Sequence, residues 1–193
     1  MLSIFLAMLL LSPGQCTRPE RPEFPPIDTT EIPRTPRDHV YYMRSNGGVP
    51  PTDSINKWLG SVGLPPGNPW CSAMASYALD FSGTQSPEVR SGLARNFVYQ
   101  TPNSLHVQAA KVLRGEITAE KGWMVVYQRG NTIFGHNGII TEDWSGADGV
   151  YISGNTSPPS GGSEFSGGGV WEKPATIRPG SAFRITEFII IKK

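Results

Sequence analysis

The chain has 193 residues, 38% of them hydrophobic and 10% aromatic, a composition that favours a folded domain over a long disordered chain. Seventeen Lys and Arg residues against sixteen Asp and Glu residues leave a net charge of +1. This excess of positive charge is too small to bind nucleic acid electrostatically. Two cysteines are too few for a disulfide framework or for a closed zinc site. We therefore expect no nucleic-acid partner, no metal and no cofactor.

The N-terminal part of the chain is typical of an export signal followed by a tether. Its first eleven residues are almost wholly apolar, but a membrane-spanning helix needs about 20 such residues, so we predict a signal peptide over residues 1–16. Cys16 allows a second interpretation, a lipoprotein-type signal in which this cysteine carries the lipid. Residues 17–38 contain six prolines among charged residues, a pattern that predicts an extended tether. The catalytic domain is then expected over residues 39–193, with His39 solvated at the end of the tether.

Helical patterns occupy the first part of this domain. Thr52 or Asp53 can cap a short helix that runs through Leu59. A longer, buried helix is predicted to start at Trp70, after a proline-rich turn, because apolar residues recur there at steps of three and four, namely Ala73, Met74, Tyr77, Ala78 and Phe81. Residues 104–115 predict a third helix, which a glycine ends.

After the third predicted helix the hydrophobic period changes to that of β-strands. The predicted strands cover residues 123–128, 134–141, 149–153, 169–171 and 182–191, and Gly-rich turns join them. Helices that come early and antiparallel strands that come late predict an α+β fold.

Cys71 stands just after the proline-rich turn, in the first turn of the predicted buried helix. The thiolate is the nucleophilic form of cysteine, and the unpaired N–H groups at a helix N-terminus favour it by lowering the pKa of the thiol. The backbone N–H of Cys71 could also stabilise an oxyanion formed at an attacked carbonyl. A lone cysteine is also a common core residue, so this position alone leaves both interpretations open.

A cysteine nucleophile needs a base and a group that orients the base. Among three histidines His136 is the preferred base, because it stands on a predicted strand between Gly135 and Gly138, which let a backbone or a substrate approach closely. His106 falls inside the predicted third helix. Asn155 ends the next strand, and its amide oxygen can accept a hydrogen bond from the other ring nitrogen of the histidine.

Alternatives remain at these positions. Glu142 and Asp143 compete as partners of the histidine, although they follow it on its own strand, and Asn155 is also a turn former. The two acidic residues, together with Asp148, offer oxygen ligands for Ca²⁺, but a solvated acidic turn is the favoured interpretation.

Three segments of the chain together resemble the cysteine, histidine-dependent amidohydrolase/peptidase (CHAP) domains. They are GNPWCSAMASYAL, KGWMVVYQRG…FGHNGIITED and YISGNTS…GGGVWEK, and the likeness covers roughly residues 50–192. The resemblance implies a papain-like α+β fold, in which N-terminal helices, with the nucleophile at a helix N-terminus, pack on a C-terminal antiparallel sheet. It also implies that Cys71 is the nucleophile, His136 the base and Asn155 the orienting residue.

CHAP domains cleave amide bonds in bacterial peptidoglycan, so the resemblance implies a cysteine peptidase or amidase that hydrolyses stem peptides through a thioester. One alternative is a wall-binding module without turnover, in which Trp70, Trp144 and Trp171 would stack on sugars. Another is a transpeptidase or acyltransferase that passes the acyl group to an amine.

The predicted signal peptide and the resemblance also give expectations for location and partners. We expect an exported protein, periplasmic or secreted, with lipid anchoring through Cys16 as the alternative. We expect a monomer whose partner is its peptidoglycan substrate. If the protein is a toxin directed at rival cells, an immunity or inhibitor protein is a further expected partner.

Overall fold

The computed structural model describes residues 38–161 and 168–192, so the predicted signal peptide, Cys16 and residues 17–37 of the predicted tether lie outside it. The helices are α1 (Asp38–Ser45), α2 (Thr52–Ser61), α3 (Cys71–Phe81), α4 (Asn96–Tyr99) and α5 (Ala109–Leu113), with a 3₁₀ helix, η1, at Asn103–Leu105. The strands are β1 (His106–Gln108), β2 (Met124–Arg129), β3 (Gly135–Ile140), β4 (Asp148–Thr156), β5 (Gly169–Thr176) and β6 (Phe183–Ile189). Of the helices just named, none is both long and apolar enough to cross a membrane.

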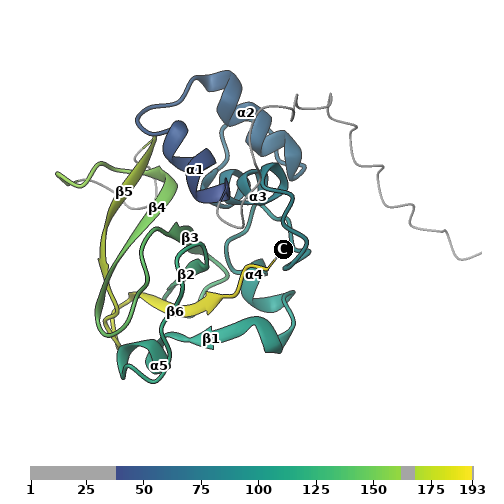
Figure 1. Ribbon diagram of the computed structural model, residues 1–193. Helices are drawn as coiled ribbons and strands as arrows, with labels where there is room; N and C mark the ends of the chain where they lie inside the picture. Colours follow the sequence, from purple (N-terminus) through teal and green to yellow (C-terminus); the bar gives the residue numbers. More distant parts are fainter. Residues whose placement is uncertain (1–37, 162–167, 193) are drawn as a thin grey trace, which may run out of the picture. The chain divides into compact units, whose positions relative to one another are not determined.

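The strands of the described residues form one six-stranded sheet in the order β1-β6-β2-β3-β4-β5, and each neighbouring pair is antiparallel. Figure 1 shows α1, α2 and α3 gathered at one end of this domain, and β1 and α5 at the other. Apart from the short edge strand β1, the strands follow the helices in the chain. The α+β fold class predicted from the sequence is therefore confirmed.

Alternation along the central strands gives the sheet two apolar faces, because successive side chains of a strand point to opposite sides. One face, which includes Met124 and Ile139, packs against α1, α2 and α3. The other face, which includes Val125 and Ile140, packs against α5 and Trp144. Residues that are neighbours in β2 or β3 therefore belong to different cores, and this difference decides where each side chain of the site points.

The predicted buried helix is α3, which begins at Cys71, one residue later than expected. Nine of its 11 residues are buried, since the small side chains of Ala73, Ala75 and Ala78 let α1, α2, β3 and β4 pack closely around it. The shorter predicted helix is α2, but the capping prediction is wrong, because Pro51 occupies the N-cap position and no side chain caps the helix.

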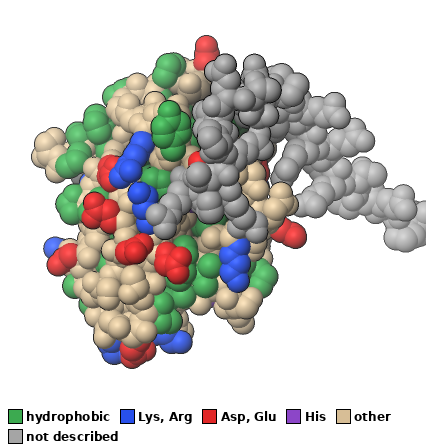
Figure 2. All heavy atoms as spheres, in the orientation of Figure 1, with side chains coloured by type: hydrophobic (Ala, Val, Ile, Leu, Met, Phe, Trp, Pro, Cys, Tyr) green, Lys and Arg blue, Asp and Glu red, His purple; other side chains and the backbone are tan. Residues whose placement is uncertain are grey.

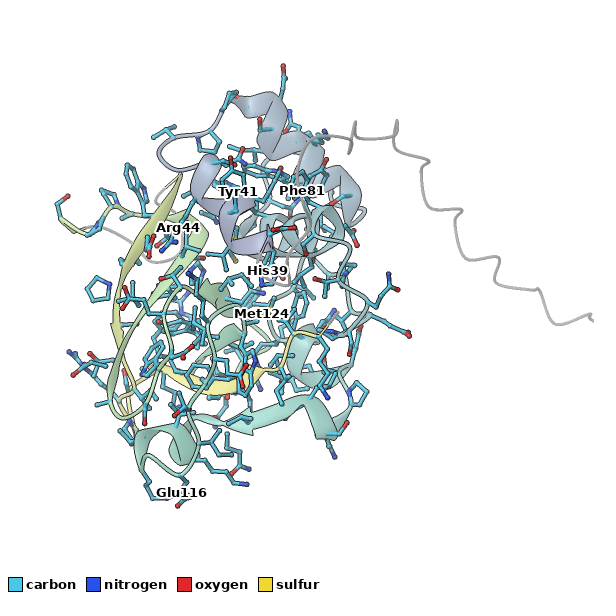
Figure 3. All side chains as sticks on the ribbon, viewed as in Figure 1. His39, Tyr41, Arg44, Phe81, Glu116 and Met124 are labelled. Carbon is cyan, nitrogen blue, oxygen red and sulfur yellow. The ribbon has the colours of Figure 1, made fainter. Side chains whose placement is uncertain are left out.

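The structure corrects the prediction that His39 is solvated. This residue lies in α1, which the sequence patterns did not predict, and it is fully buried. Its Nε2 donates a hydrogen bond to the carbonyl oxygen of Gly122 at 2.7 Å, and Figure 3 shows the side chain pointing from α1 into the domain. At the other end of α1, Arg44 forms an exposed ion pair with Glu172 of β5 at 2.6 Å. α1 therefore belongs to the folded domain.

The prediction of a third helix over residues 104–115 is wrong for most of its length. Residues His106–Gln108 form β1, and the helix is reduced to α5. β1 pairs with β6 through His106 opposite Ile189 and Val107 opposite Phe188. Pairing at the sheet edge outweighs the helical preference of this segment, because helix propensity is a weak force compared with tertiary contacts.

Candidate active site

The structure places Cys71 at the first residue of α3, as predicted. Trp70 occupies the N-cap position, and no side chain caps the helix. The N–H groups of the first turn have no partner within a helix, and those of Cys71 and Ser72 donate hydrogen bonds to the sulfur. The thiol is buried and is not part of a disulfide.

Burial nevertheless raises the pKa of the Cys71 thiol to about 11. Hydrogen bonds from the backbone N–H groups of Asn137, Ser72 and Cys71 itself lower the pKa, but they offset only part of the effect of burial. The N–H groups at the helix N-terminus thus lower the pKa of the thiol as expected, but burial outweighs them. Because the thiol is protonated at neutral pH, it can act as a nucleophile only if a base removes its proton.

His136 is the second residue of β3, and its ring lies on the face of the sheet opposite α3. It is almost completely buried, with 1% of its surface exposed. The centroid of the ring lies 6.0 Å from that of Tyr127 and 6.4 Å from that of Tyr151. Nε2 lies 2.8 Å from Oγ of Ser153, so one ring nitrogen has a fixed partner on the neighbouring strand.

Asn137, which follows His136, points the other way and faces α3. Its Nδ2 donates a hydrogen bond to the hydroxyl of Ser72 at 3.2 Å, and its backbone N–H donates to the sulfur of Cys71. The thiol therefore meets β3 at the peptide unit that joins His136 to Asn137. The predicted nucleophile thus contacts the backbone next to the predicted base, whose ring lies on the other face of the sheet.

The glycines on either side of the histidine have a structural purpose. A Cβ at Gly135 would lie 2.2 Å from the carbonyl oxygen of Tyr127, and a Cβ at Gly138 would lie 2.5 Å from that of Ile152. Both distances are far below van der Waals contact. The close approach predicted at these positions is thus that of the two neighbouring strands, β2 and β4, which hold the histidine strand from both sides.

Asn155 lies within β4, is buried, and has a left-handed backbone with φ of 54°. Asparagine tolerates this conformation better than most residues. The preceding residue, Gly154, faces α3, where a Cβ would lie 2.5 Å from the ring of Trp70 and 2.8 Å from the sulfur of Met74. β4 thus packs closely against the start of α3, the helix that carries Cys71. The orienting role of Asn155 stays a prediction.

Ser153 is the residue of this site that sequence reasoning missed. The pairing of β3 with β4 includes Ile139 opposite Ile152, and this register, continued along both strands, would set His136 opposite Asn155. The left-handed backbone at Asn155 is incompatible with a regular strand. Ser153 lies two residues earlier on the same face of β4, and its Oγ reaches the ring. The strand register was the available signal, but the sequence does not show where it breaks.

Two of the acidic residues considered above, Asp143 and Asp148, have other partners. Oδ1 of Asp143 accepts a hydrogen bond from the backbone N–H of Lys121 at 2.8 Å. Oδ1 of Asp148 accepts one from the hydroxyl of Thr176 at 2.6 Å. Within residues 38–161 and 168–192, His, Cys, Asp and Glu side chains form no group of three or more that could hold a metal ion.

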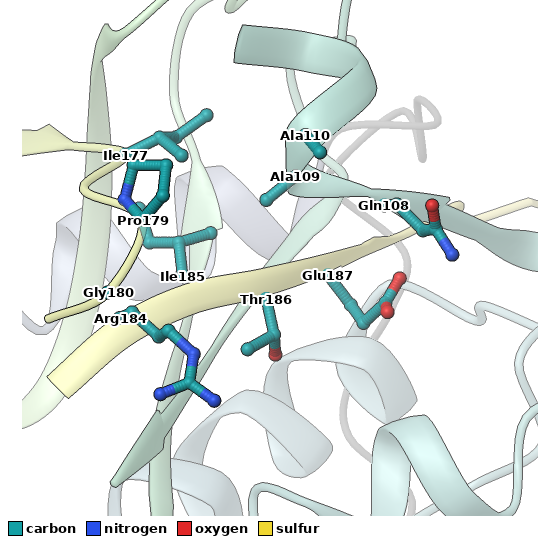
Figure 4. Close-up of a pocket in the computed structure, with 10 residues that line it drawn as sticks. All are labelled: Gln108, Ala109, Ala110, Ile177, Pro179, Gly180, Arg184, Ile185, Thr186 and Glu187. Atoms are coloured by element: carbon teal, nitrogen blue, oxygen red, sulfur yellow. The ribbon is translucent and has the colours of Figure 1, made fainter. Parts of the chain in front are cut away.

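A separate pocket of about 290 Å³ lies between β6, the start of α5 and the segment that precedes β6. Figure 4 shows Ile177 and Ile185 on one side of it and the polar groups of Arg184 and Glu187 on the other. Burial raises the pKa of Glu187. The lining residues do not include the predicted nucleophile, base or orienting residue, so this pocket is not part of the candidate active site.

The chain was compared with protein-family models and with curated proteins, and neither comparison gave a match. The likeness to CHAP domains therefore rests on the sequence segments quoted above.

Proposed function

We propose that the chain is a cysteine peptidase or amidase with a papain-like arrangement, which hydrolyses amide bonds of peptidoglycan stem peptides. The observation that supports it most is the position of the Cys71 thiol. The thiol lies at the start of a buried helix and accepts a hydrogen bond from the backbone N–H that follows His136. A cysteine nucleophile needs a base close by, and His136 is the histidine whose backbone lies next to the thiol.

The mechanism starts from a neutral thiol, because burial raises the pKa of Cys71 to about 11. His136 removes the thiol proton as the sulfur attacks the amide carbonyl, and an oxyanion forms on the carbonyl oxygen. The C–N bond then breaks, the leaving amine takes the proton from the imidazolium, and a thioester remains on Cys71. Water, deprotonated by His136, attacks this thioester and releases the acid and the free thiol.

Peptidoglycan as substrate and export as location come from the resemblance and from the predicted signal peptide. Figure 2 shows acidic and basic side chains interspersed on one face of the domain, in keeping with the balanced charge of the chain. Such a surface suits a substrate that carries both ammonium and carboxylate groups better than a polyanion.

The wall-binding alternative loses part of its support. Trp70 and Trp144, two of the three tryptophans expected to stack on sugars, are 5% and 0% exposed. The ring of Trp70 packs on that of Trp58, and the ring of Trp144 packs edge-on against Phe188. Both side chains belong to the cores of the domain, and their predicted role in sugar binding is wrong.

Digestion of purified peptidoglycan by the full chain tests the proposed function. Wild type should release new amines and defined fragments, which mass spectrometry identifies, and Cys71→Ala should release none. Cys16→Ser is the matched control, because it removes the other cysteine of the chain and should leave hydrolysis unchanged. Fragments from Cys71→Ala would contradict the proposal. Capture of the acyl group by an added amine faster than by water would show a transferase instead.

A further inference from the structure

The hydroxyl of Ser153 is enclosed between the ring of His136 and two backbone carbonyl groups. Its Oγ lies 2.8 Å from Nε2 of His136, 2.6 Å from the oxygen of Asn137 and 3.2 Å from the oxygen of Gly154. Ser153 and Asn137 are fully buried, and His136 is 1% exposed. The hydroxyl is therefore shielded from bulk water, and its hydrogen bonds are made to these three groups.

The number of protons at this oxygen decides the direction of each hydrogen bond. A hydroxyl donates one proton and accepts through its lone pairs, whereas a carbonyl oxygen only accepts. The shortest contact, to the oxygen of Asn137, is the one that takes the proton of Ser153. If that proton turned to Nε2, two lone-pair-bearing oxygens would face each other at 2.6 Å in a buried site, which is unfavourable. Ser153 must therefore accept a hydrogen bond from Nε2–H of His136.

We propose that Ser153 is a positioning residue that holds His136 as its Nε2–H tautomer and thereby makes Nδ1 the basic atom of the site. A neutral imidazole carries a proton on only one nitrogen, and the lone pair on the other is the base. The hydroxyl of Ser153 fixes this choice without adding a charge. The inference rests on the proposed cysteine chemistry for its catalytic meaning, but the tautomer itself can be tested without it.

The same hydrogen bond persists through the proton transfers of the reaction. When Nδ1 takes the proton from the sulfur of Cys71, the ring becomes an imidazolium whose nitrogens both donate. Nε2–H still donates to Ser153, and the hydroxyl of Ser153 still donates to the oxygen of Asn137. When Nδ1 passes its proton to the leaving amine, the ring returns to the same tautomer. The ring therefore keeps its orientation in both charge states.

The direct test is the ¹⁵N chemical shifts of the two ring nitrogens of His136 in the full chain, with His136→Gln used to identify the signals. We expect Nε2 to carry the proton in wild type and a mixture of tautomers in Ser153→Ala. Ser153→Thr keeps the hydroxyl and should restore the Nε2–H form. A wild-type ring protonated at Nδ1 would overturn the inference, and so would a tautomer that is unchanged in Ser153→Ala.

Kinetics separate positioning from a merely structural role. Ser153→Ala should lower kcat of amide hydrolysis by about 10- to 100-fold with little change in KM, because a correctly oriented base contributes about 10²- to 10⁴-fold. Ser76→Ala is the matched control, since Ser76 is equally buried and its hydroxyl bonds to the backbone of Ser91 at 3.0 and 3.1 Å. Equal losses in both variants would overturn the positioning role. If wild type and Cys71→Ala are equally inactive while the tautomer is Nε2–H, the proposed function fails and the tautomer assignment stands.

Discussion

The thiol of Cys71 shows two opposing influences on one side chain. The backbone N–H groups of Cys71 and Ser72 at the helix N-terminus, together with that of Asn137 in β3, stabilise the thiolate, yet burial raises the pKa of the thiol to about 11. The position that favours a nucleophile is thus closed to water in this structure. The proposed chemistry therefore depends on a base, for which His136 is the predicted residue.

The raised pKa of Cys71 predicts a loss of stability in alkaline solution. A thiol with a folded-state pKa of about 11 and an unfolded value near 9.0 contributes stability that is complete below about pH 9 and is lost as the pH rises toward 11. The difference in free energy of unfolding between wild type and Cys71→Ala should therefore shrink by up to about 2–3 kcal/mol between pH 8 and pH 11. Denaturant titrations at each pH measure this difference in free energy. A difference that does not change with pH would contradict the raised pKa of Cys71.

Cys71 and His136 should act as one catalytic unit. Cys71→Ala and His136→Ala should each lower kcat/KM for amide hydrolysis by about 10³-fold or more, and the double variant should lose little beyond either single variant. The reason is that the base has no role once the nucleophile is gone. The rate of amine release, measured for each of the three variants, tests this prediction. Losses that multiply would show that the two residues act independently.

At the scale of elements, the predictions succeed where one residue pattern dominates. The buried alanines of α3 and the apolar run of β2 indicate their own structure, because each element is apolar on nearly every side that it presents to a core. Residues 106–108 lack such a pattern, and their pairing with β6 decides their structure. α1 was missed because it directly follows a proline-rich segment whose composition indicates a tether.

In the candidate site, the sequence indicated Cys71 and His136 but not Ser153, whose contact with His136 depends on a local break in strand register.

A buried histidine joins α1 to the turn before β2, and this predicts a loss of stability in mild acid. Burial lowers the pKa of His39, and the weaker opposing effect of its hydrogen bond to Gly122 does not restore it. The unfolded chain binds a proton near pH 6.5 that the folded chain rejects, so stability is lost as the pH falls below about 6.5. The free energy of unfolding should fall more steeply between pH 7 and pH 5 in wild type than in His39→Gln. Identical slopes would contradict a buried, neutral His39.

At the scale of the molecule, one sheet separates two hydrophobic cores. Both cores must form for Cys71 and His136 to take their positions. The core shared with α3 positions Cys71, and the core on the other face surrounds the ring of His136 through Tyr127 and Tyr151. The peptide unit between His136 and Asn137 lies in β3, within the sheet that separates these two cores. The predicted nucleophile and the predicted base thus lie on opposite faces of the same strand.

The second core predicts that Trp144 is essential for stability. Trp144 is fully buried and packs edge-on against Phe188, with ring centroids 5.3 Å apart. Trp144→Ala should lower the free energy of unfolding by about 3–5 kcal/mol, as expected for a large aromatic side chain removed from a core. Trp171→Ala, at a partly exposed site on β5, is the control and should cost much less. Equal costs in denaturant titrations would show that Trp144 is not a core residue.

The central claim is that Cys71 forms a thioester during amide hydrolysis, and the most direct measurement is the mass of the protein in acid-quenched reactions. Wild type mixed with stem peptide should gain the mass of the acyl fragment, and peptide mapping should place this mass on Cys71. Release of amines by a protein that carries no such adduct, together with activity that survives in Cys71→Ala, would contradict the account.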